Sequence, residues 1–223
     1  MYSIDLSKIS LDDFKNIILS IDLLPGRRVL LENLPRVIEH LQGQEILDLE
    51  TLRKRLQSKK NYHNLAETIC VSVEYLTVLN REINSYVSKP ISLAELGVFS
   101  DDELERLGQA GIKSTKDFYE QSLTPLARSQ MEIRLLIPAQ RILQSLWLAD
   151  LLRINGVGPV YAKILVEIGI HSVEDYLRQD SGEILENYRN FGAGSQTTRA
   201  SLGLKDVEYC KRFCRLLTTD IEW

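Results

Sequence analysis

This sequence has few cysteines, no long apolar run and no net positive charge, and each of these absences excludes some classes of protein. Three cysteines among 223 residues are too few, and odd in number, for a disulfide framework. A reducing cytoplasmic compartment is the simplest interpretation. No apolar run approaches the length that spans a bilayer, and residues 1–7 lack the basic and apolar segments of a signal peptide. We therefore expect a cytoplasmic protein with no membrane partner.

The charge balance argues against a general affinity for nucleic acid. The formal net charge is −4, whereas nucleic-acid binders are usually basic, at least locally. Hydrophobic residues make up 44% and charged residues 26%, which is ordinary for a globular protein with one or two cores.

Catalytic and metal-binding motifs are also missing. There is no nucleophile motif, no phosphate loop with lysine and serine or threonine, and no zinc-protease helix. His40, His63 and His171 are scattered along the chain. Cys210 and Cys214 lie four residues apart, on one face of a predicted helix, with no further ligands at suitable spacing, so we expect them to pack as small apolar side chains. We predict a protein that is not an enzyme and that holds no metal and no cofactor.

What the sequence does contain is helical periodicity and an internal repeat. Apolar residues recur at helical spacing with few alternating runs, which predicts an all-α fold. Residues 111–119 resemble residues 169–177: each stretch begins with a glycine that would end a helix in the left-handed conformation. Each then offers a serine that caps the next helix, with an aspartate three residues later. These pairs are Ser114 with Asp117 and Ser172 with Asp175.

A weaker third copy surrounds Ile46, with Asp48 as the helix cap. Pro35 precedes Ile46 by the same distance at which Pro159 precedes Ile170. A long amphipathic helix is predicted after each copy, over residues 72–86, 138–153 and 205–218. The glycines of residues 187–196 predict an additional mobile loop in the third copy. A linker at residues 88–92 divides the chain into an N-terminal helical domain, residues 1–88, with a degenerate copy, and a second domain, residues 89–223.

The most informative segment is residues 151–170. Gly156 and Gly158 let the backbone turn sharply and leave amide groups uncovered, and Pro159 favours the start of a helix. This order predicts a helix, a tight turn over Gly156, Val157 and Gly158, and a second helix. Amide groups at such a turn lie at the positive end of a helix and are able to hold a phosphate. The pattern is a helix-hairpin-helix, typical of proteins that hold nucleic-acid backbones.

From Trp147 to Ala162 the sequence resembles the domain of unknown function 4332, and the resemblance extends over about residues 91–217. The resemblance implies paired helix-hairpin-helix units, in the style of the C-terminal domain of the bacterial RNA polymerase alpha subunit. It also implies a bacterial origin. Nucleic-acid binding is implied only by analogy of fold.

The turn has two interpretations. In the functional one, the amides of Gly156, Val157 and Gly158 bind a phosphate, Lys163 leans back toward it, and Arg153 contributes from just before the turn. In the structural one, the glycines permit close helix packing and Val157 fills the core. The position after Gly158-Pro159 usually carries a cation in phosphate-binding versions, and here it is Val160.

The corresponding turn of the middle copy is acidic. It begins at Gly97, and Ser100 with Glu103 predicts a capping box. Asp101 and Asp102 would repel a phosphate, so we do not expect this turn to contact nucleic acid.

Two further features stay open in the sequence. A basic run extends from Arg53 to Lys60 and, with Arg27 and Arg28, forms either a patch for phosphates or an acidic partner, or a solvated helix end. Trp223 is either part of a docked tail or an exposed interaction residue.

Two functions are therefore predicted. The first is a non-enzymatic nucleic-acid-binding module that contacts backbone phosphates without reading bases. The alternative is a protein–protein interaction or scaffold module without nucleic-acid binding.

Overall fold

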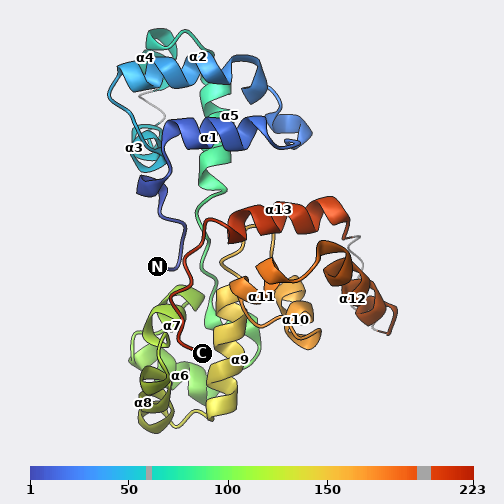
Figure 1. The fold of residues 1–223 in the computed structure, drawn as a ribbon. Helices are drawn as coiled ribbons and strands as arrows, with labels where there is room; N and C mark the ends of the chain where they lie inside the picture. The colour runs from blue at the N-terminus through green and yellow to red at the C-terminus, as the bar shows by residue number, and fades with distance from the viewer. Residues whose placement is uncertain (59–61, 195–201) are drawn as a thin grey trace. The chain divides into compact units, whose positions relative to one another are not determined.

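The computed structural model describes residues 1–58, 62–194 and 202–223, with side chains up to residue 191 and again from 202. Every regular element in these ranges is a helix, and β-type backbone pairing occurs there only as isolated bridges. The prediction of an all-α fold is therefore confirmed (Figure 1). No helix in the described part of the chain is both long and apolar enough to cross a membrane.

The chain divides into two compact units. One unit, here the N-terminal unit, is Asp5–Val87. The other, the C-terminal unit, combines Ser88–Trp223 with Met1–Ile4. The first four residues therefore belong with the C-terminal unit, which sequence patterns do not reveal.

The N-terminal unit consists of short helices around a small apolar core. Helices α1 and α2 pack together, and α5 packs against α2, α3 and α4. Asp48 caps α3 by accepting a hydrogen bond from the Thr51 N–H, as predicted. The elements are η1 (Leu6–Lys8), α1 (Leu11–Leu19), η2 (Pro25–Arg27), α2 (Leu30–Gly43), α3 (Leu49–Arg55), α4 (Tyr62–Thr68) and α5 (Val73–Asn84).

The degenerate copy in this unit departs from its pattern at Pro35. Pro159 begins a helix, but Pro35 lies inside α2, where it removes one backbone donor from the helix. The expected equivalence of the two prolines is therefore wrong.

The C-terminal unit is built around α9, which packs against α7, α8 and α10. Helices α11 and α12 pack on α13, which follows them in the chain. The elements are η4 (Leu93–Leu96), α6 (Asp101–Gln109), α7 (Thr115–Gln121), α8 (Pro125–Leu135), α9 (Ala139–Leu151), α10 (Pro159–Glu167), α11 (Val173–Arg178), α12 (Ser181–Gly194) and α13 (Leu204–Cys214).

The predicted helix ends agree closely with the structure. Gly111 and Gly169 adopt φ angles of +80° and +87°, the left-handed conformation that ends the helices before them. Ser114 and Asp117 form the predicted capping box. Ser172 caps α11 as expected, but the carboxylate of Asp175 accepts from the His171 N–H instead of completing a box with Ser172. These ends are predictable because each depends on bonds between neighbouring residues.

The predicted loop over residues 187–196 is wrong, because α12 continues to Gly194. Ile184, Leu185 and Tyr188 are buried and lie at helical spacing, so packing of this apolar face extends the helix toward the glycines. Residues 195 and 196 lie outside the described part of the chain.

Candidate functional site

The turn between α9 and α10 brings its glycines to the surface and its valine into the core. Gly156 and Gly158 are exposed, whereas only 7% of Val157 is exposed. Gly158 is the N-cap of α10 and, having no side chain, supplies no capping bond to the first turn. The first amide groups of α10 therefore have no side-chain acceptor from the cap position.

Gly156 also has a structural role. Its φ angle is +96°, a conformation that L residues with side chains rarely adopt. A Cβ atom at this position would lie 2.9 Å from Sγ of Cys210 and 3.2 Å from the ring of Tyr209. The absence of a side chain lets α13 approach the turn, so close packing accounts for this glycine.

Arg153 does not lie at the surface, and its prediction as a nucleic-acid contact is wrong. Only 2% of the residue is exposed. Its guanidinium forms an ion pair with Asp150 and donates to the Tyr2 carbonyl at 3.0 Å and to the Thr218 carbonyl at 2.6 Å. It also donates to the Tyr119 hydroxyl at 2.7 Å and stacks 4.4 Å from the centre of that ring. Every side of the cation is occupied, which leaves no access for a phosphate.

Asp150 joins this interior network to α11. One of its oxygens pairs with Arg153, and the other accepts from the Val173 N–H at 2.7 Å. Burial raises the pKa of Asp150, although its bonds to Arg153 and Val173 oppose that shift. Burial also raises the pKa of Tyr119 to about 12. The cluster therefore holds separate segments of the C-terminal unit together.

Lys163 remains exposed, but it extends toward the other turn. Its Nζ atom lies 3.4 Å from where a Cβ atom of Gly97 would be. Gly97, with a φ angle of +64°, opens the acidic turn before α6. Of the predicted phosphate-binding set, the structure keeps Gly156, Gly158 and Lys163 accessible, while Arg153 and the Val157 side chain are interior.

The acidic turn is organised for helix capping. Ser100 and Glu103 form the predicted capping box, and Arg141 pairs with Glu103 at 2.5 Å. Burial acts to raise the pKa of Glu103, but the bonds from Ser100 and Arg141 outweigh it and lower that pKa. Asp101 and Asp102 are exposed at the first turn of α6, where carboxylates favour the helix dipole.

The basic run of the N-terminal unit is largely engaged in local contacts. Arg53 donates to Asn84 at 3.1 Å, and Lys54 pairs with Glu50 at 3.3 Å. Arg27 pairs with the buried Glu82, and Arg28 pairs with Asp22. These contacts favour the interpretation of a solvated helix end. Lys59 and Lys60 lie outside the described residues.

The thiols of α13 are interior. Cys210 and Cys214 are buried, and burial raises the pKa of Cys210 to about 12, so the thiol stays protonated at neutral pH. Among the described residues, no group of three histidine, cysteine or acidic side chains is placed to hold a metal ion. His171 stacks on Trp147, with ring centres 4.0 Å apart.

Trp223 combines the two interpretations given for it. The preceding residue is docked: the Glu222 N–H donates to the Leu123 carbonyl at 2.9 Å, and Arg128 donates to the Glu222 carbonyl at 2.7 Å. Trp223 itself is 52% exposed.

Sequence reasoning missed an unusual surface on α8. The inner face of this helix is apolar and buried through Met131 and Leu135. On the opposite side of α8, Leu126 and Ile133 are 68% and 76% exposed, and Leu136, the residue directly after the helix, is 74% exposed. We call these three side chains the outer face of α8. The signal was present in the sequence as apolar residues separated by seven and then three positions.

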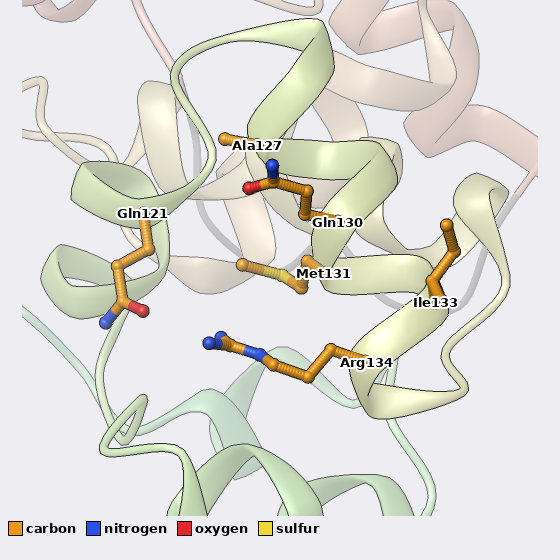
Figure 2. A pocket seen from close by; sticks show the side chains of 6 residues that line it. All are labelled: Gln121, Ala127, Gln130, Met131, Ile133 and Arg134. Carbon is orange, nitrogen blue, oxygen red and sulfur yellow. The ribbon is translucent and has the colours of Figure 1, made fainter.

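An open hollow of about 500 Å³ adjoins this helix. Figure 2 shows Met131 and Arg134 extending toward Gln121, which comes from the end of α7, while Ile133 points away from them. The lining residues are Gln121, Ala127, Gln130, Met131, Ile133 and Arg134.

The sequence was compared with models of known protein families. A family model described as a domain of unknown function, DUF4332, matches residues 97–213, more than half of the 223 residues. The chain belongs to the DUF4332 family. The predicted membership of this family is thus confirmed, and the matched residues include the acidic turn, α8 and the Gly156 turn. No curated protein and no solved structure matches the chain.

Proposed function

We propose that this DUF4332 protein is a non-enzymatic binding module whose ligand is another protein chain. The observation that carries the proposal is the outer face of α8, where Leu126, Ile133 and Leu136 are exposed to water. Several large apolar side chains exposed along one helix are a feature of surfaces that bind protein.

Folding of the unit does not require an apolar outer face on α8. The inner face already packs through Met131 and Leu135, and the opposite face of such a helix is normally polar. Leu136 has a φ angle of +52°, which is unfavourable for leucine and ordinary for glycine or asparagine. A leucine that is both strained and exposed indicates a role outside the packing of its own unit.

The surroundings of the Gly156 turn favour protein over nucleic acid as the ligand. Arg153 is unavailable, and Val160 is 57% exposed at the position where a phosphate-binding turn would carry a cation. The acidic start of α6 adds carboxylates to a second turn. Few accessible cations are therefore left at these turns to bind the phosphates of a nucleic acid.

Affinity capture from nuclease-treated extract of the source cells tests the proposal. Wild-type protein is compared with the Ile133→Glu variant and with Leu47→Glu, a control at a leucine that is 61% exposed in the N-terminal unit. We expect wild type and Leu47→Glu to retain the same protein in stoichiometric amount, and Ile133→Glu to lose it. Retention of nucleic acid alone, or equal retention by Ile133→Glu, would count against the proposal.

Nucleic-acid binding is the second candidate, and one observation favours it. The first turn of α10 has no side-chain cap, Gly156 and Gly158 are exposed beside it, and Lys163 is exposed on the same helix. A single turn of this kind would bind backbone phosphates weakly, with a Kd on the order of 10⁻⁴–10⁻⁶ M that weakens with salt.

Fluorescence anisotropy with a short DNA duplex and a single-stranded RNA, at low and high salt, measures this affinity. If α10 binds phosphates, Lys163→Gln weakens binding to both probes, and Lys15→Gln, at a lysine in the N-terminal unit that pairs with Asp12, leaves it unchanged. No binding at low salt eliminates the candidate.

A further inference from the structure

We infer that residues 218–223 occupy a docking site that also binds an acidic, non-helical segment of a partner protein, and that they compete with this partner. We call residues 218–223 the docked segment. The docking site consists of the Leu123 carbonyl and the guanidinium groups of Arg128 and Arg153. The inference does not depend on the outer face of α8, because the structure contains a bound segment at this site.

The docked segment is held mainly through its backbone. After α13 the chain returns toward the turn between α7 and α8 without forming a helix (Figure 1). Arg153 donates to the Thr218 carbonyl at 2.6 Å. The Glu222 N–H donates to the Leu123 carbonyl at 2.9 Å, and the Glu222 carbonyl accepts from Arg128 at 2.7 Å. Since other peptides carry the same backbone groups, another non-helical segment is able to form these bonds.

The docking site is held in place by bonds that do not involve the docked segment. Arg128 also donates to the carbonyls of Ser122 at 2.9 Å and Leu123 at 3.2 Å. Arg153 is fixed by its ion pair with Asp150. Both cations are therefore positioned before a ligand arrives, which lowers the ordering cost of binding. If the docked segment leaves, each guanidinium loses one acceptor, and a carbonyl of the partner replaces it.

The charge of the docked segment indicates which kind of partner suits the site. The docked segment contains Asp220 and Glu222 and no basic residue. Asp220 pairs with the amino group of Met1, and the negative charge of Glu222 acts on Arg128. Acidic side chains in a partner segment would meet the same positive groups, so the complementary partner is an acidic segment.

Few apolar contacts hold the docked segment in place. None of its residues is buried: Thr218 and Ile221 are half-buried, and the other four are exposed. Segments with few buried apolar contacts open at a low cost in free energy. The docked segment is therefore able to leave while the C-terminal unit stays folded, which competition by a partner requires.

Fluorescence anisotropy with a labelled peptide of residues 218–223, added to the full chain, tests the inference. In wild type the docked segment competes, so the apparent affinity is reduced to the fraction of molecules with an open site. The double variant Asp220→Lys/Ile221→Gly, the released variant, changes only the docked segment. We expect it to bind the peptide at least about tenfold more tightly than wild type. Glu167→Lys makes the same charge change at an exposed residue of α10 and should bind as wild type does.

Two further changes test how the segment is recognised. A peptide with lysine in place of both acidic residues should bind the released variant at least about tenfold more weakly, because it places like charges together. Arg128→Gln in the released variant removes a backbone donor and should weaken binding of the acidic peptide. Ile133→Glu in the released variant, on the outer face of α8, should leave peptide binding unchanged. Circular dichroism establishes that each variant is folded.

Hydrogen exchange of wild type provides an independent measurement. Because the site holds one occupant, excess peptide should displace the docked segment and speed up exchange of the Glu222 amide, which is bonded to Leu123. Unchanged exchange at excess peptide would overturn the inference. So would a released variant that binds the peptide no more tightly than wild type, or equal binding of the acidic and lysine peptides.

Discussion

At the scale of single residues, Arg153 shows that burial can make a charged side chain unavailable to a ligand. In the sequence it is a cation beside a glycine turn, the position expected of a phosphate contact. In the structure its guanidinium is enclosed by Asp150, Tyr119 and the carbonyls of Tyr2 and Thr218. Its charge is paired within the C-terminal unit, so Arg153 stabilises that unit and does not contact a ligand.

Replacing Arg153 with methionine should destabilise the C-terminal unit strongly. The change leaves Asp150 buried without its counter-ion, which typically costs about 3–5 kcal/mol. Urea denaturation monitored by circular dichroism measures the loss. Arg178→Met is the matched control, because Arg178 is exposed and pairs with Glu174 at the surface, where an ion pair contributes about 0–1 kcal/mol. Equal effects of the two substitutions would contradict the structural role of Arg153.

The two glycines of the α9–α10 turn should respond differently to substitution by alanine. Gly156→Ala adds a Cβ at a φ of +96° and 2.9 Å from the Cys210 sulfur, so we expect a loss of about 1–3 kcal/mol in the free energy of unfolding. Gly158→Ala adds a Cβ with no atom within 4 Å at a φ of −95°, and its effect should stay within about 0.5 kcal/mol. Thermal melts of both variants decide the matter, and similar melting temperatures would show that Gly156 is not needed for packing.

At the scale of helices, α8 carries exposed apolar side chains that packing within its own unit does not account for. One apolar face packs against the unit, and the opposite apolar face does not. Its last turn is held by Arg106, which donates to the Leu135 carbonyl at 2.7 Å, and the chain then enters the left-handed conformation at Leu136. The end of α8 is thus fixed by a neighbouring helix, while Leu136 extends outward.

Leu136→Gly should separate stability from binding. Glycine adopts the φ of +52° without steric cost, and an exposed side chain loses little packing, so we expect the free energy of unfolding to rise by about 0.5–1 kcal/mol at low protein concentration. The same substitution removes an apolar side chain from the outer face and should weaken association. Chemical denaturation measures the free energy of unfolding, and affinity capture from cell extract measures the association. Lower stability together with unchanged association would refute this view of Leu136.

Sequence patterns predicted helix ends better than they predicted the site. Asp48, Ser114 and Pro159 were placed correctly because caps and proline act on backbone groups within a few residues. The burial of Arg153 was not predictable in this way, since its partners Tyr2 and Thr218 are distant in the chain. The outer face of α8 escaped notice because apolar spacing alone does not distinguish a buried face from an exposed one.

At the scale of the whole molecule, the family match and the division into units do not coincide. The DUF4332 match covers residues 97–213, whereas the C-terminal unit also includes residues 1–4 and the chain beyond residue 213. Tyr2 is buried there, donating or accepting a hydrogen bond with Thr115 at 2.8 Å and meeting the Tyr119 ring edge to face at 5.6 Å. The start of the chain therefore completes the core of the unit that contains the matched region.

Tyr2→Ala should accordingly destabilise the C-terminal unit and spare the N-terminal unit. Removing a buried aromatic ring typically costs about 3–5 kcal/mol. Hydrogen exchange monitored by mass spectrometry resolves the two units, and we expect faster exchange in α7 and α9 with little change in α1 and α2. Faster exchange confined to α1 and α2 would contradict the assignment of the first residues.

The central claim is that this protein binds protein through the outer face of α8. Photo-cross-linking in the source cell tests it most directly, with a benzophenone amino acid placed at position 133 and, as a control, at position 47. A discrete protein adduct from position 133, absent from position 47, is the expected result, and an adduct of twice the chain's mass would identify a second copy. No adduct from position 133, or the same adducts from both positions, would contradict the claim.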